Sequence, residues 1–155
     1  MDKNKQQTIS AGLYLVSTPI GNMEDITYRA LNVLKKSDVI LCEDTRRSGK
    51  LLSYFNIKNK LLPYHKFNEV KVSTKIVDSI KENKVISLIS DAGTPAISDP
   101  GMILVNKCIE ANLIVHPVPG SEIVGVPASE INEIILFFFI KSIILPLTFD
   151  SLNLW

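Results

Sequence analysis

The sequence has few of the residues that build metal sites or disulfide frameworks. Of its 155 residues, two are cysteine and two are histidine. Cys42 and Cys108 lie in apolar surroundings without C-x-x-C spacing, and His65 and His116 are isolated from other ligand types along the chain. We therefore expect reduced core thiols, as in an intracellular protein, and no zinc or other metal site.

The sequence also lacks an apolar run long enough to cross a membrane. The stretch Ile134–Leu147 is shorter than the about 20 residues that a membrane-spanning helix needs, and Lys141 and Pro146 interrupt it. The first residues, Met1–Gln7, are polar and unlike a signal peptide. We expect a cytoplasmic protein without a membrane segment, and a tail of incomplete structure.

Two nucleotide-binding motifs are absent, because no segment matches G-x-G-x-x-G or G-x-x-x-x-G-K-[ST]. The composition, 46% hydrophobic and 21% charged, is that of an ordinary globular domain. Basic residues outnumber Glu43, Asp44 and Glu69 across positions 43–75. This stretch is suited to phosphates, although a solvated lysine-rich surface explains it equally well.

Short apolar runs alternate with helical patterns. The expected strands are Gly12–Ser17, Val39–Cys42, Lys60–Pro63, Val85–Ser90 and Leu113–Pro117. The expected helices are Asp25–Lys36, Val70–Glu82 and Pro100–Ala111. Runs that are apolar throughout indicate strands covered on both faces, and their alternation with helices indicates right-handed βαβ units. The predicted fold class is α/β, with a mostly parallel five-stranded sheet and helices on both faces.

Ligands of such sheets bind beyond the carboxyl ends of the strands. The loops expected there are Thr18–Asn22, Glu43–Arg47, Asp91–Gly101 and Pro119–Ser121. Their glycines allow the backbone to approach a ligand closely, and Asp91 and Thr94 add hydrogen-bonding groups. The sequence therefore predicts a ligand cleft lined by these loops.

Three segments resemble a known family: LYLVSTPIGNMEDITYRALNVLKKSDVILCEDTR, SDAGTPAISDPG and VPG, over about residues 11–120. They closely resemble the tetrapyrrole methylase superfamily, in particular members that methylate the ribose 2′-hydroxyl of a decoding-centre cytidine in small-subunit ribosomal RNA. The resemblance implies S-adenosyl-L-methionine as the cofactor, bound in a cleft between two domains. It also implies small-subunit ribosomal RNA as the partner and a homodimer for the full-length members.

The resemblance also implies roles for single residues. The expected cofactor-binding residues are Pro19, Gly21, Asp91, Gly93, Thr94, Pro95, Ile97, Pro119 and Gly120. By position, Glu43 and Asp44 are candidates for the base that takes the proton of the ribose hydroxyl. Arg46 and Arg47 are candidates for binding substrate phosphates. A structural ion pair between Asp44 and Arg46 is an equally weighted alternative.

After Gly120 the sequence departs from the family. Ser121-Glu122-Ile123 stands where small residues usually follow, and the match fades after Ser129. We expect residues 11–120 to form a first domain and 121–155 a degenerate remnant of the link to a second domain, in a truncated or disrupted chain that binds the cofactor weakly or not at all. The alternatives are a non-catalytic or vestigial domain, or a relative that methylates a tetrapyrrole, another small molecule or a protein side chain.

Overall fold

The computed structural model describes residues 9–96 and 100–120. The chain divides into two units, 1–122 and 123–155, and the described residues all belong to the first. Some of the predicted features lie outside the described residues. They are Ile97, its neighbours Ser98 and Asp99, and the remnant expected at 121–155 with its apolar stretch.

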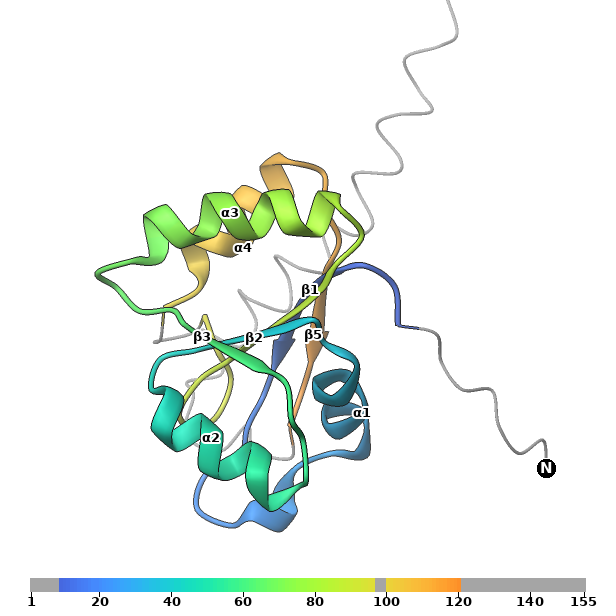
Figure 1. The fold of residues 1–155 in the computed structure, drawn as a ribbon, viewed down its shortest axis with the longest axis vertical. Coiled ribbons are helices and arrows are strands. Elements are labelled where there is room, and N and C mark those ends of the chain that lie inside the picture. Colours follow the sequence, from blue (N-terminus) through green and yellow to red (C-terminus); the bar gives the residue numbers. More distant parts are fainter. Residues whose placement is uncertain (1–8, 97–99, 121–155) are drawn as a thin grey trace, which may run out of the picture. The chain divides into compact units, whose positions relative to one another are not determined.

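The described strands form one five-stranded sheet, and each pairing between them is parallel (Figure 1). The strands are β1 (Gly12–Val16), β2 (Val39–Cys42), β3 (Lys60–Pro63), β4 (Val85–Ile89) and β5 (Val115–Val118). Their order across the sheet is β3-β2-β4-β1-β5. The predicted α/β fold with five strands is confirmed; β2 and β3 have the predicted bounds, and the ends of the other strands differ by at most two residues.

The four described helices cover both faces of this sheet. They are α1 (Tyr28–Lys36), α2 (Thr45–Tyr54), α3 (Glu69–Lys81) and α4 (Met102–Glu110), and a short 3₁₀ turn, η1 (Met23–Asp25), precedes α1. Figure 1 shows α1 and α2 on one face and α3 and α4 on the other. The chain moves in one direction along the sheet from β1 to β3 and returns from β3 to β5. Right-handed crossovers in opposite directions place their helices on opposite faces.

The ends of the predicted helices differ from the observed ones by at most three residues, and one described helix, α2, was not predicted. The loop expected at Glu43–Arg47 ends early, because the chain enters α2 at Thr45. No helix was predicted for this segment, although α2 buries Ser48, Leu51 and Leu52 at helical spacing. The first helix begins at Tyr28 rather than Asp25, because the Thr27 side chain caps it by accepting a hydrogen bond from the Ala30 N–H at 3.1 Å.

The centre of the sheet is the most buried part of the described fold. Every residue of β1 and of β4 is buried, as expected for adjacent strands with helices on both sides. The edge strand β3 is partly exposed. Because β1 and β4 are held so firmly, the loops that leave their carboxyl ends start from a rigid base.

Candidate functional site

The site lies where the path of the chain reverses across the sheet. Strands β1 and β4 are neighbours, yet the chain leaves β1 towards α1 on one face and leaves β4 towards α4 on the other (Figure 1). Connections that diverge in this way open a crevice at the carboxyl ends of the two strands, where ligands of doubly wound folds bind.

The loops after β1 and β4 are joined directly. The Thr18 N–H donates to the Gly93 carbonyl at 2.9 Å, and the Gly93 N–H donates to the Thr18 carbonyl at 3.0 Å. The Thr18 hydroxyl donates to the Ser90 carbonyl at 3.1 Å, and the hydroxyls of Ser17 and Thr94 are 2.8 Å apart. Gly93 has a φ of +81°, which favours glycine at this joint. The two loops therefore form one platform, and the structure places Gly93 and Thr94 within it.

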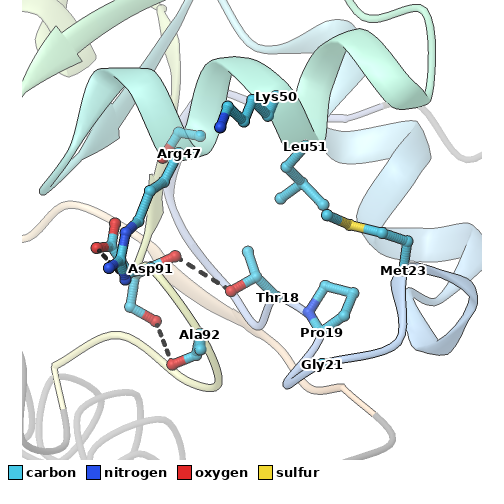
Figure 2. A pocket seen from close by; sticks show the side chains of 11 residues that line it. Thr18, Pro19, Gly21, Met23, Arg47, Lys50, Leu51, Asp91 and Ala92 are labelled. Carbon is cyan, nitrogen blue, oxygen red and sulfur yellow. Dashed lines mark hydrogen bonds and ion pairs between the residues drawn. The ribbon is translucent and has the colours of Figure 1, made fainter.

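A pocket of about 250 Å³ opens beside this platform (Figure 2). Three segments line it: Thr18, Pro19, Gly21 and Met23 after β1; Arg47, Ser48, Lys50 and Leu51 on α2; and Ser90, Asp91 and Ala92 after β4. Pro19, Gly21, Arg47 and Asp91 are the predicted site residues among them. Figure 2 shows Arg47 reaching from α2 to Asp91, so that the helix and the loop after β4 meet across the pocket.

Asp91 has an incomplete set of partners. Its Oδ2 lies 3.3 Å from Nη1 of Arg47. Its Oδ1 is buried and has no hydrogen-bond partner among the described residues. Buried polar atoms almost always have a partner, so this oxygen is suited to a donor or a cationic group from a ligand.

Asp44 and Arg46 form an ion pair, which was the structural alternative to a catalytic role for Asp44. Asp44 is the N-cap of α2, and its Oδ1 accepts a hydrogen bond from the Arg46 N–H at 2.8 Å. The Arg46 guanidinium donates to both carboxylate oxygens, at 3.2 and 2.9 Å. The hydrogen bonds from Arg46 lower the pKa of Asp44 to about 2. Neither residue lines the pocket, and neither does Glu43, which is exposed at the end of β2.

The remaining predicted cofactor residues lie close to the platform without lining the pocket. Pro95 follows Thr94 and is buried. Pro119 and Gly120 follow β5, which pairs with the other side of β1. They stand at the same carboxyl edge of the sheet, one strand away from the platform.

Most of the residues by which α2 lines the pocket were not predicted from the sequence. They are Ser48, Lys50 and Leu51, and Met23 from η1 completes the rim. The signal for the helix was present. Asp44 is a good N-cap residue, and apolar side chains follow it at helical spacing.

Both cysteines are free and buried, as expected. Burial raises the pKa of the Cys108 thiol to about 11 and also raises that of Cys42. Among residues 9–96 and 100–120, no group of three or more histidine, cysteine or acidic residues is placed to hold a metal ion. In the same part of the chain, no helix has the length and apolar character needed to span a membrane.

The fold is that of a doubly wound α/β domain with a pocket at the carboxyl ends of its central strands. Comparison with known proteins gives the family. The model of the tetrapyrrole (corrin/porphyrin) methylases matches residues 12–130, and this chain belongs to that family.

Two relatives illustrate how similar the chain is to named members. It is 47% identical over 117 residues to the ribosomal RNA small subunit methyltransferase I of Halalkalibacterium halodurans, covering 76% of this chain and 40% of the relative. It is 56% identical over 108 residues to the protein of the same name from Mesomycoplasma conjunctivae, covering 69% and 45%. The chain thus spans less than half the length of these relatives.

A solved structure has the same fold. The uroporphyrin-III-C-methyltransferase from Thermus thermophilus aligns with a TM-score of 0.57 and 24% identity, over 71% of this chain and 46% of that one. At this identity the likeness concerns the fold alone.

Proposed function

We propose that this chain provides the cofactor-binding part of an S-adenosyl-L-methionine-dependent methyltransferase that acts on small-subunit ribosomal RNA. The observation that carries the proposal is the pocket between the loops after β1 and β4 and helix α2, in a chain whose relatives are named for this activity. The proposed acceptor is the ribose 2′-hydroxyl of a decoding-centre cytidine. The proposed setting is the cytoplasm, with a homodimer as the complete enzyme.

The residues of the pocket fit such a cofactor. The buried Oδ1 of Asp91 lacks a partner among the described residues. A carboxylate oxygen has two lone pairs, so Oδ1 is suited to a donating or cationic group of the cofactor on one of them and to the acceptor hydroxyl on the other. The loop after β1 offers backbone surface at Pro19 and Gly21. When bound, S-adenosyl-L-methionine supplies a methyl group on a positively charged sulfur, so the protein mainly provides orientation and exclusion of water.

We propose Asp91 as the carboxylate that holds or removes the proton of the acceptor hydroxyl. It lines the pocket, whereas Asp44 is engaged as the cap of α2 and Glu43 is exposed outside the pocket. Arg47 binds one oxygen of Asp91 and keeps the carboxylate directed into the pocket. Glu43 remains the second candidate for the base because of its position at the end of β2.

Arg47 and Lys50 are the proposed phosphate ligands of the pocket, with Arg46 beside them. Arg47 and Lys50 project from the same side of α2 (Figure 2). Arg46 has a side chain that is 88% exposed, and it does not line the pocket. Guanidinium groups bind phosphates in a bidentate manner, which suits an RNA backbone that passes across this helix.

A joined protein tests the proposal. It consists of residues 1–120 of this chain followed by the part of the Mesomycoplasma conjunctivae relative that lies beyond the matched region. With labelled S-adenosyl-L-methionine and small ribosomal subunits, it is expected to transfer label to ribosomal RNA. The chain alone is the control and is expected to transfer little, since its pocket is smaller than the about 300–1,000 Å³ of usual ligand sites. A folded joined protein that leaves the RNA unlabelled would favour a non-catalytic domain.

A further inference from the structure

Hydrogen bonds tie the backbone of the turn between β3 and α3. The Asn68 side chain accepts a hydrogen bond from the His65 N–H at 2.9 Å and donates one to the Pro63 carbonyl at 3.0 Å. The N–H groups of Asn68 and Glu69 both donate to the His65 carbonyl, each at 2.9 Å. Such a network restricts the backbone of residues 65–68, which we call the β3–α3 turn.

Phe67 stands at the tip of this turn and is 99% exposed. Its ring contact within the described residues is with His65, edge to face, at a centroid distance of 6.0 Å. A phenylalanine gains stability from burial, and here that gain is absent although the backbone beneath it is well tied. A fully exposed aromatic ring on a well-tied backbone is suited to contact with a partner.

The surroundings of Phe67 select the chemistry of that partner. Lys66 precedes it along the chain and Lys71 lies in the first turn of α3, and both are exposed. Lys71 and Lys75 are four residues apart and share one face of α3. Glu69, half-buried, is the single acidic residue between positions 65 and 77. An exposed aromatic ring among cations is the arrangement that binds single-stranded nucleic acid, where bases stack on rings and phosphates meet lysines.

The turn also lies at the edge of the sheet formed by the carboxyl ends of the strands, which is the edge where the pocket lies. β3 pairs with β2 in parallel, so its carboxyl end lies at the same edge as the start of α2, which carries Arg47 and Lys50. The β3–α3 turn and the start of α2, whose Arg47 and Lys50 line the pocket, therefore lie along one edge of the sheet (Figure 1). An RNA strand that enters the pocket across α2 can continue towards Phe67.

We propose that the β3–α3 turn is a stacking platform for an unpaired RNA base, with Phe67 as the ring and Lys66 and Lys71 as the phosphate ligands. The proposal rests on the proposed function for the identity of the nucleic acid. It adds a binding site that is separate from the cofactor pocket, and its test needs no methyl transfer.

The test measures binding of a labelled, unstructured oligoribonucleotide of mixed sequence to the full chain by fluorescence anisotropy. Phe67→Ala is expected to weaken binding about tenfold, within the range that loss of one stacked base gives, while Phe67→Trp retains it. Tyr54→Ala is the matched control. Tyr54 is also exposed and lies near lysines, but it ends α2 at the opposite edge of the sheet, so its loss should leave binding unchanged.

Salt dependence gives a second readout. Replacing Lys66 or Lys71 by alanine should lower the slope of log K against log salt by about one for each phosphate ligand removed. Wild-type affinity in Phe67→Ala, or no RNA binding by the wild-type chain, would overturn the proposal. A change in sedimentation without a change in RNA affinity would identify the turn as a protein interface and overturn it too. The joined protein separates this failure from failure of the proposed function, because methyl transfer is measured independently.

Discussion

Replacing Gly101 by alanine is expected to destabilise the chain more than the same replacement at Gly21. Both glycines have positive φ, +152° and +97°, so alanine at either position carries a backbone cost of about 1–3 kcal/mol. At Gly21 a Cβ would meet no heavy atom within 4 Å. At Gly101 it would lie 2.8 Å from the Cβ of Ala96 and 2.9 Å from Cδ2 of Leu88. Overpacking of this kind costs a further amount of about 1–3 kcal/mol.

The difference between the two variants therefore measures how firmly the loop after β4 is packed. Urea unfolding of the full chain, followed by circular dichroism, should place Gly101→Ala below Gly21→Ala by roughly 1–3 kcal/mol in the free energy of unfolding. This is a large part of the about 5–15 kcal/mol that typical domains have. Equal losses in the two variants, or a Gly101→Ala variant as stable as wild type, would refute the tight packing and with it the fixed platform.

Three further predictions concern the core, the pH dependence and the site. The Tyr64 hydroxyl lies 3.0 Å from that of the buried Ser73, so Tyr64→Phe should lower the free energy of unfolding, measured by heat or urea, by about 1–2 kcal/mol. Adding Ser73→Ala should recover part of this loss. Burial, and to a smaller extent the nearby positive charge of an arginine, lower the pKa of His116. The unfolded chain therefore binds the proton more readily, and stability falls as the pH drops below about 6.5. Between pH 7.5 and 5.5 the melting temperature of His116→Gln should fall less than that of the wild-type chain, and an equal fall would contradict this. In the joined protein, Asp91→Asn should lower methyl transfer by about 100-fold or more, whereas Glu43→Gln should change it little; the reverse order would make Glu43 the base.

The sequence was sufficient for the central sheet. Strands β1 and β4 are apolar at nearly every position, and this pattern is enough to predict them. The structure buries every residue of both strands. The strand order β3-β2-β4-β1-β5 depends on contacts between distant segments, and no local pattern contains it. The expectation that the loops after β1 and β4 meet came from the rule for parallel sheets rather than from their residues.

Helix α2 shows where local reasoning was insufficient. The segment after β2 has Thr45, Ser48 and Gly49 in its first half, which are weak helix formers, beside an expected loop. Its apolar face becomes evident only when Leu51 and Leu52 are read together with the cap at Asp44. The same carboxylate was a candidate base by position. Whether it caps a helix or faces a ligand depends on the direction of α2, which the sequence pattern does not specify.

An NMR titration of the ¹⁵N-labelled joined protein with S-adenosyl-L-methionine locates the cofactor site directly. The cofactor is predicted to bind at the platform formed by the loops after β1 and β4, beside α2. The largest amide shift changes are predicted at residues 17–23 and 90–96, with smaller ones at 47–51. Saturable changes at other parts of residues 9–120, with the amides of both loops unmoved, would contradict this prediction.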